Sequence, residues 1–246
     1  MSNFLFIALL VFASCDQKNS SLTAQQIIDK AMIAHGADKV SNAKIAFDFR
    51  DINYIAIRNK GNFKLSRIFK EDSILIKDEL SNTGFKRFKN NQLSNTIDSM
   101  AVKYASSVNS VHYFSLLPYG LNDKAVKKKL LEDAVIKGEA YYKVQISFSE
   151  DGGGEDFEDV FVYWIGKEDF KMDYLAYSYH TDGGGKRFRE PKNERIVNGI
   201  RFLDYNNYKT KNASTKLKNL DKAFENNELI KLSEINLKNV TVKLLD

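Results

Sequence analysis

The feature that most constrains the fold is a two-residue alternation of apolar and polar side chains that starts near residue 43. In its first occurrence Ile45, Phe47 and Phe49 share one parity, and Asp48 lies on the other. Successive side chains of a β-strand point to opposite faces of a sheet, so this period is typical of strands. The chain is therefore expected to fold mainly as a β-sheet.

The alternation returns in many short segments that are separated by polar or glycine-containing breaks. Breaks rich in Asp, Asn and Gly are typical of the turns between antiparallel strands. The expected strands lie at 44–49, 53–59, 61–69, 72–79, 139–148, 158–166, 173–180, 185–190, 195–209 and 234–245, with a further hairpin at 82–92. About ten strands are thus predicted, in a mainly β (α+β) sheet that curls around an interior.

Three segments have the pattern of helices instead. Thr23 and Gln26 form a capping box, and Gly36 can end the helix that begins there. A second helix is predicted at 98–117 and a third at 122–133. One N-terminal and two mid-chain helices are therefore expected to cover the sheet.

The N-terminus has the pattern of an export signal. Phe4–Phe12 is an apolar run of nine residues, which is too short to cross a hydrocarbon core of roughly 30 Å. It has the length of a signal-peptide core and ends in Ala13 and Ser14, directly before Cys15. This arrangement resembles the lipobox of bacterial lipoproteins, although Phe12 stands where Leu or Val is usual. The resemblance implies cleavage before Cys15 and lipidation of that residue.

The cysteine count agrees with this interpretation. Cys15 is the only cysteine in the chain, so no disulfide framework and no thiol nucleophile are expected in the folded part. The expected organisation is a signal peptide at 1–14, a lipidated Cys and polar tether at 15–22, and one domain at 23–246. A plain secretory signal and a buried N-terminal strand are the alternatives, and the polar tether argues against the strand.

Two glycine-rich stretches, 149–159 and 178–190, interrupt the strands. A phosphate-binding P-loop would need glycine where His180 stands and Ser or Thr where Arg187 stands. Because both stretches lie between alternating segments, they are predicted to be hairpin tips, and an anion-contacting loop is the alternative.

Other catalytic and metal-binding patterns are weak. The three histidines have no metal-ligand spacing, and the acids near Glu155 do not match a calcium loop, so neither a metal nor a cofactor is predicted and a surface calcium contact is the alternative. His180 and Asp182 are the only pair that hints at a hydrolase. Net charge is +5 with acids and bases interleaved, and Lys127–Lys129 is interpreted as a solvated helix face rather than a nucleic-acid contact.

Aromatic residues gather on the later strands and fall on both parities, so both faces of the sheet carry rings. Packing in the core explains the position of each ring taken alone. The rings taken together indicate an apolar cavity that they line. The candidate ligand-binding residues are Phe47, Phe49, Tyr163, Trp164, Tyr177, Tyr179, Arg187, Phe188 and Arg189.

The signal, the early helix, the strand run, the mid-chain helices and the returning strands resemble the LolA/LppX-like lipoprotein-carrier superfamily. Blocks such as "LLPYGLND", "DVFVYWI" and "NGIRFLDYNNYK" look like those of an uncharacterised bacterial lipoprotein family, and the likeness covers roughly residues 22 to 244. The resemblance implies an unclosed antiparallel half-barrel, covered by helices, that binds acyl chains or lipidated proteins in its cavity. An anchored chain departs from the carrier LolA, which moves between membranes.

The function predicted from these observations is a non-catalytic envelope lipoprotein that binds a lipid or other apolar ligand in a half-barrel cavity. The expected location is the envelope of a two-membrane bacterium, with a lipid anchor in the outer membrane. The alternative is a structural or interaction module that docks on an envelope protein through exposed aromatic hairpins.

Overall fold

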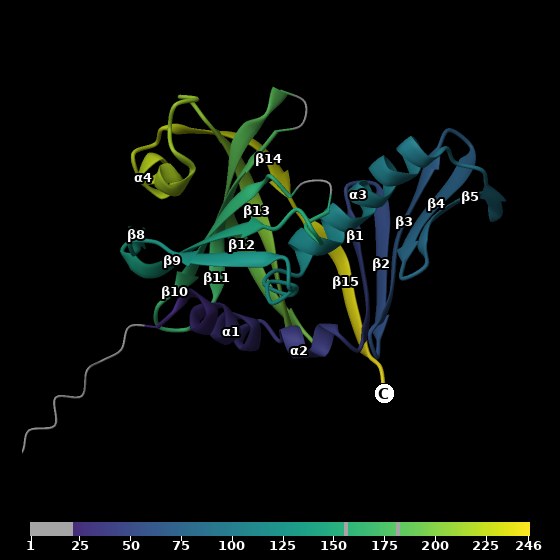
Figure 1. The fold of residues 1–246 in the computed structure, drawn as a ribbon, viewed down its shortest axis with the longest axis horizontal. Coiled ribbons are helices and arrows are strands. Elements are labelled where there is room, and N and C mark those ends of the chain that lie inside the picture. The colour runs from purple at the N-terminus through teal and green to yellow at the C-terminus, as the bar shows by residue number, and fades with distance from the viewer. Residues whose placement is uncertain (1–21, 155–156, 181–182) are drawn as a thin grey trace, which may run out of the picture.

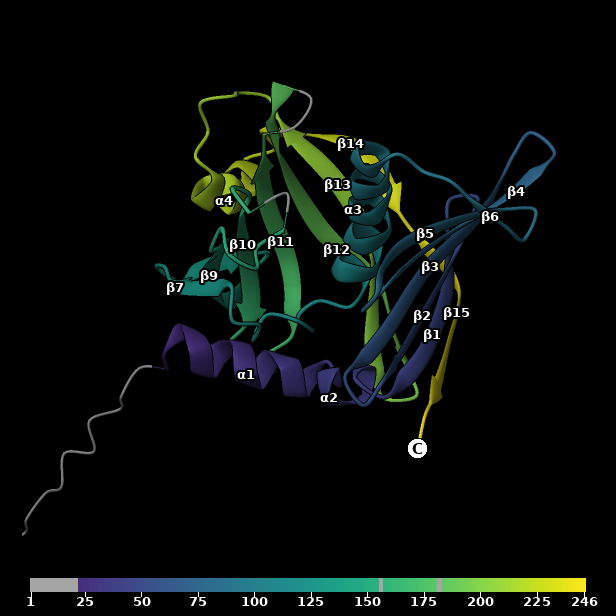
Figure 2. The ribbon, with the colours of Figure 1, turned by 45° about the vertical axis from the view of Figure 1, so that its right-hand side comes forward.

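The computed structural model describes residues 22–154, 157–180 and 183–246, and the predicted signal, Cys15 and Asp182 lie outside these ranges. The described residues form two antiparallel sheets, of seven and eight strands, together with four α-helices. The sheets stand at an angle to each other with one long helix between them (Figures 1 and 2). The mainly β (α+β) prediction is confirmed.

The first sheet is a meander to which the last strand of the chain is added at one edge. Its strand order is β15-β1-β2-β3-β4-β5-β6. The strands are β1 (Ala43–Phe49), β2 (Ile52–Asn59), β3 (Asn62–Glu71), β4 (Ile74–Ser81), β5 (Gly84–Lys89), β6 (Gln92–Ser94) and β15 (Leu237–Leu244). Each pair along β1 to β6 is a hairpin, which follows from the short polar breaks in the sequence.

The second sheet is built from the later strands. Its order is β14-β13-β12-β11-β10-β9-β7, and β8 pairs separately with β9. The strands are β7 (Val126–Leu130), β8 (Ala134–Ile136), β9 (Glu139–Phe148), β10 (Val160–Gly166), β11 (Met172–Tyr179), β12 (Gly185–Val197), β13 (Ile200–Thr210) and β14 (Leu229–Ile235). Both glycine-rich stretches join antiparallel neighbours, β9 to β10 and β11 to β12, as expected for hairpins, and residues 155–156 and 181–182 within them lie outside the described residues.

Two segments link the sheets: the one with α3, from β6 to β7, and a short one near the C-terminus. β14 ends at Ile235 and pairs with β13, whereas β15 begins at Leu237 and pairs with β1. The C-terminal segment therefore passes from an edge of the second sheet to an edge of the first. Among the described residues β6 and β7 pair on one side only, so the arrangement is not closed into a barrel.

The helices occupy three different places. α1 (Ala24–Ala34) and α2 (Ala37–Val40) lie across one end of the sheets, α3 (Asp98–Ser115) lies between them, and α4 (Leu220–Glu225) covers the outer side of the second sheet after the 3₁₀ turn η2 (Leu217–Asn219) (Figures 1 and 2). The capping box of Thr23 and Gln26 is present, and Gly36 follows the end of α1 with φ +67°, as predicted. None of the helices in the described ranges combines the length and the apolar character that crossing a membrane requires.

The apolar core has three main parts. The concave face of the second sheet packs under α1 with Ile27, Ile28, Tyr163 and Leu175, a second cluster joins the sheets around Ile45, Phe47 and Phe202, and a third lies under α4 with Trp164, Phe188 and Leu220. The two-faced aromatic pattern therefore reflects a sheet that is covered on both sides, on one by α1 and α3 and on the other by α4.

The predicted helix at 122–133 is wrong. This segment forms a turn and then β7, whose Val126, Lys128 and Leu130 pair with Phe148, Ile146 and Val144 of β9. Lysine-rich sequence favours a helix in isolation, but pairing with an exposed sheet edge overrides that preference. The lysines of β7 instead mark an edge strand, where charge discourages pairing with another chain.

The predicted number of strands was too low and two short helices were missed. The described residues contain β1 to β15, because β7, β8 and β14 were not recognised as separate strands; the segments predicted at 195–209 and 234–245 include only the last residues of β12 and β14, before β13 and β15. α2 and α4 were missed because they are only four and six residues long. Helices this short depend on packing rather than on their own propensity.

Candidate ligand-binding site

An apolar pocket of about 530 Å³ lies between α3 and the concave face of the second sheet. α3 contributes residues along most of its length to the lining, from Val102 to Phe114. Phe148, Phe161 and Tyr177 line the opposite side, on β9, β10 and β11. The pocket therefore exists because α3 stands between two sheets instead of lying flat on the second one.

Phe161 is the central ring of the pocket wall. Its centroid lies 5.6 Å from that of Tyr177 in a stacked arrangement and 6.0 Å from that of Phe148 in an edge arrangement. Tyr163, which is completely buried, stacks behind it at 6.1 Å. Phe161 was not singled out from the sequence, although it shares the parity of Tyr163 and stands directly opposite Tyr177 in the strand register.

Arg189 of β12 brings a positive charge to this apolar wall. Its guanidinium lies 4.6 Å from the ring centroid of Phe114 and 5.2 Å from that of Tyr177, and its Nη2 donates a 3.4 Å hydrogen bond to the Tyr177 hydroxyl. The side chain is buried, its Nε has no hydrogen-bond partner, and the described residues place no carboxylate within ion-pair distance of it. Two aromatic faces thus hold this cation at the pocket.

The structure brings several of the predicted site residues together on the concave face of the second sheet. Tyr177 and Arg189 line the pocket. Tyr163 supports its wall from behind, Tyr179 packs 6.0 Å from Tyr177, and Arg187 lies 5.0 Å over the Tyr179 ring. These residues share one face because they are on β10, β11 and β12 at the same parity.

Two predicted residues lie on the opposite face. Trp164 and Phe188 pack edge-on at 5.5 Å, and Phe188 also lies 5.0 Å from Phe224 of α4. Each is next to a concave-face residue along its strand, and successive side chains of a strand point to opposite faces. Both rings therefore point outward, into the cluster under α4. The structure does not bring them to the pocket.

The remaining two predicted residues belong to the first sheet. Phe47 is buried and stacks on Tyr54 at 5.4 Å, in the cluster that joins the sheets. Phe49 packs edge-on against Phe114 at 5.8 Å. Phe49 therefore supports α3 next to the pocket, whereas Phe47 belongs to the core.

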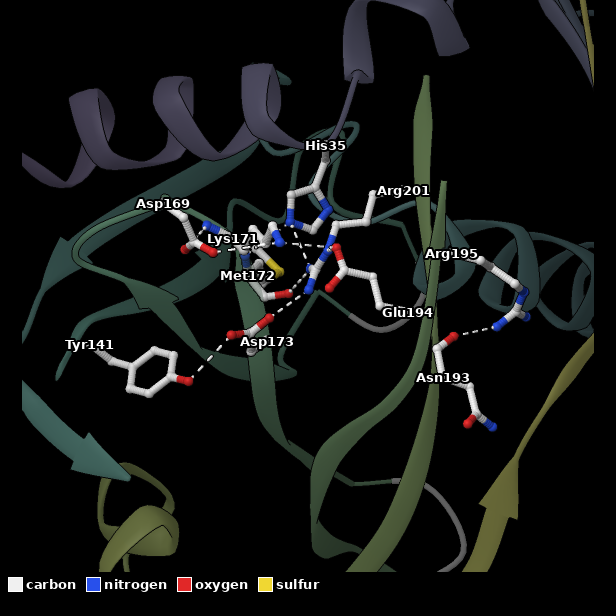
Figure 3. A network of polar contacts seen from close by, with 10 residues as sticks. All are labelled: His35, Tyr141, Asp169, Lys171, Met172, Asp173, Asn193, Glu194, Arg195 and Arg201. Carbon is white, nitrogen blue, oxygen red and sulfur yellow. Dashed lines mark hydrogen bonds and ion pairs between the residues drawn. The ribbon is translucent and has the colours of Figure 1, made fainter. Parts of the chain in front are cut away.

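A buried polar network lies at the α1 end of the second sheet (Figure 3), and its residues are not part of the pocket lining. His35 Nε2 accepts a 2.9 Å hydrogen bond from the backbone N–H of Met172 and a 3.1 Å bond from Arg201. Arg201 also donates to Asp173 at 2.6 Å and to Glu194 at 3.0 Å. Since both bonds to His35 require an acceptor, the imidazole is neutral with its proton on Nδ1.

The electrostatics of this network agree with that assignment. Burial, followed by the positive charge of Arg201, lowers the pKa of His35 to about 3. Burial raises the pKa of Asp173, although the Arg201 guanidinium opposes this change. A neutral histidine whose Nε2 already accepts two hydrogen bonds does not take up a proton readily. We therefore assign the network a structural role in fastening α1 to β11 and β13.

Of the suggested hydrolase pair, Asp182 lies outside the described residues and His180 is exposed. The structure shows no group of three or more metal-ligating side chains in the part of the chain it describes. The pocket between α3 and the second sheet is therefore the strongest candidate site.

A family model described as "Family of unknown function (DUF6503)" matches residues 2–237. No curated protein matches the sequence.

Among solved structures, the fold resembles a LolA superfamily protein from Nitrosomonas europaea, with a TM-score of 0.45, 12% identity and coverage of 92% of this chain and 94% of the other. A domain from Vibrio parahaemolyticus assigned to outer membrane lipoprotein sorting gives 0.49 and 9%, with coverage of 89% and 93%. The lipoprotein LppX of Mycobacterium tuberculosis gives 0.30 and 10%, with coverage of 64% and 89%. No residue role is transferred from these structures.

Proposed function

The chain belongs to the DUF6503 family, whose function is unknown, and we propose that it binds an acyl chain or another apolar molecule in the pocket between α3 and the second sheet. In this proposal the linked sheets act as an unclosed half-barrel with α3 inside it. The protein is a non-catalytic binding protein of the cell envelope, anchored to the outer membrane through a lipid on Cys15.

The observation that carries the proposal is the apolar surface that α3 leaves uncovered. The fully buried residues of α3, such as Val108 and His112, face the first sheet. Across the pocket Phe148, Phe161 and Tyr177 are only partly buried. Covering such apolar surface stabilises a complex by roughly 25 cal/mol for each Å² removed from water.

The size and chemistry of the pocket also fit a small apolar ligand. Pockets for such ligands span roughly 300 to 1,000 Å³ and combine aromatic walls with a few polar groups. Here the rings form the wall and Arg189 supplies a cation. The alternative, an interaction module, requires a filled interior, and the pocket favours a binding protein instead.

The test uses the full chain with Cys15→Ser, so that no acyl group of its own competes. Lipid extraction and mass spectrometry identify any co-purified ligand, and a fluorescent acyl probe measures affinity. Ala105 lines the pocket on α3, so Ala105→Trp should fill it and weaken probe binding at least tenfold. Ser107 is exposed on the same helix and lies outside the lining, so Ser107→Trp serves as the matched control.

The expected result is one bound probe per chain that Ala105→Trp removes and Ser107→Trp retains. An empty extract together with no probe uptake by the Cys15→Ser chain would contradict the proposal. Equal probe binding by both tryptophan variants would place the binding elsewhere and would also count against this pocket.

A further inference from the structure

A second, more polar pocket of about 370 Å³ adjoins the apolar one. It lies between the C-terminal half of α3, the β2–β3 hairpin and the turn around Tyr119. Asn109 and Tyr113 of α3 line both pockets, and they lie one helical turn apart on one face of the helix. The two pockets therefore meet at these side chains.

The polar pocket contains an arginine without a counter-charge. Arg58, at the end of β2, has a buried Nη1 with no hydrogen-bond partner, and its guanidinium lies 5.2 Å from the ring centroid of Tyr119. In the described ranges no carboxylate lies within ion-pair distance of it. Arg67 and Arg87, on nearby strands of the same sheet, both bind Asp78 instead, at 2.8 and 2.6 Å.

The charge of Arg58 acts on its surroundings. Burial lowers the pKa of this guanidinium. His112 lines the same pocket, and burial, with a further contribution from Arg58, lowers its pKa to about 4. Asp123 is the acidic residue in the lining; burial raises its pKa, and the cation that opposes this change is Lys128 rather than Arg58. A partly desolvated positive charge without a partner is costly, and a bound anion would offset the cost.

We propose that the Arg58 pocket binds the anionic group, a carboxylate or a phosphate, of an amphiphile whose apolar chain occupies the adjoining pocket. This inference rests on the proposed function and specifies the ligand class. The planar guanidinium offers parallel N–H donors that match both anions. Arg189 is the less suitable partner, because two aromatic rings and the Tyr177 hydroxyl already hold it.

The test compares two ligands with the same chain length and different heads, dodecanoate and 1-dodecanol, on the full Cys15→Ser chain. Arg58→Gln should weaken dodecanoate binding about tenfold, which corresponds to about 1.4 kcal/mol, and should change dodecanol binding less than about twofold. Arg189→Gln tests the other cation. Lys70, exposed on β3, provides Lys70→Gln as a control for the loss of one charge.

Each outcome has a separate meaning. If neither ligand binds the Cys15→Ser chain, the proposed function fails and this inference fails with it. If both bind and Arg58→Gln weakens them equally or not at all, the inference is overturned while the proposed function stands. A selective loss in Arg189→Gln alone would place the anion at Arg189 and overturn the assignment to Arg58.

Two further measurements complete the test. Inorganic phosphate alone should bind at least a hundredfold more weakly than dodecanoate, and tight binding that depends on Arg58 would indicate a free anion instead of an amphiphile. Thermal melting checks that Arg58→Gln is folded. If Arg58→Gln is not folded, Arg58→Lys and Arg58→Ala replace it, and Arg58→Lys keeps the charge but loses the paired donors. Dodecanoate affinity that is unchanged both in Arg58→Lys and in a folded Arg58→Ala would overturn the proposal.

Discussion

The ammonium group of Lys143 on β9 donates a 2.6 Å hydrogen bond to Asp221 of α4, and both side chains are almost completely buried. The same ammonium group also donates to the backbone carbonyl of Lys218 at 3.0 Å. This pair fixes α4 on the outer face of the second sheet, over Trp164 and Phe188. The helix that closes this face is therefore held by a charge pair as well as by apolar contact.

Asp221→Asn should destabilise the fold by about 3 kcal/mol, because it leaves the buried Lys143 charge without its carboxylate. Urea unfolding measures the loss. Glu234, which is exposed and pairs with Lys192 and Lys231, offers the control, since Glu234→Gln removes a carboxylate that solvent already screens and should leave stability nearly unchanged. An equal loss in both variants would show that burial of the pair does not matter.

Gly36→Ala should destabilise the fold by about 2 to 4 kcal/mol. Gly36 has φ +67°, and a Cβ at this position would stand 1.9 Å from the backbone oxygen of Gly199. Gly61 has φ +82°, and no atom would lie within 4 Å of a Cβ there, so Gly61→Ala isolates the backbone cost. That control should lose only about 1 kcal/mol in the same unfolding experiment.

Stability should fall as the pH is lowered from 7 to 5. The folded-state pKa is about 3 for His35 and about 4 for His112, below the unfolded value of 6.5. Between these values the unfolded chain binds more protons, so the free energy of unfolding decreases as the pH falls through this window. Each histidine should contribute on the order of 2 kcal/mol to the loss at pH 5.

Urea unfolding at both pH values checks this expectation in the original chain and in His35→Gln, His112→Gln and the exposed His180→Gln. The first two variants should each show a smaller loss between pH 7 and pH 5, and the third should match the original chain. The same loss in all four proteins would assign the pH dependence to other groups.

Phe161 and Phe188 should have opposite roles, because they lie on opposite faces of the second sheet. Phe161→Leu should weaken acyl-probe binding severalfold with little change in stability, since the ring is partly exposed in the pocket. Phe188→Leu should lower stability by about 1 to 2 kcal/mol and leave probe affinity unchanged. Reduced affinity in both variants would mean that the outer face takes part in binding.

Cys15→Ser should release the protein from the membrane, because the proposed anchor is a lipid on this residue. Metabolic labelling with a radioactive fatty acid should mark the original chain and not the variant. Fractionation should move the variant from the membrane pellet to the supernatant, since several acyl chains at roughly 0.8 kcal/mol for each buried methylene form a stable anchor. Labelling of both proteins would reject Cys15 as the lipid site.

Local patterns were sufficient for much of the fold. The alternation around Ile45 and Phe47 depends on neighbours in sequence, and β1 forms there. The capping box of Thr23 and Gln26 and the left-handed Gly36 also depend on nearby residues, and both features are found as predicted. For the site, Tyr177 and Arg189 were among the candidate residues and both line the pocket, whereas Trp164 and Phe188, of the opposite parity, were named with them and lie on the other face.

The sequence by itself thus determined where most strands and the first and longest helices form, because hydrogen bonding and side-chain alternation in these elements involve nearby residues. Tertiary structure decided the remainder. The edge of β9 turned 126–130 into a strand, α4 made the face of Trp164 an outer core, and the position of α3 between two sheets created the pockets. These outcomes depend on contacts between segments far apart in the chain, and no local pattern encodes which face of a sheet a distant helix will cover.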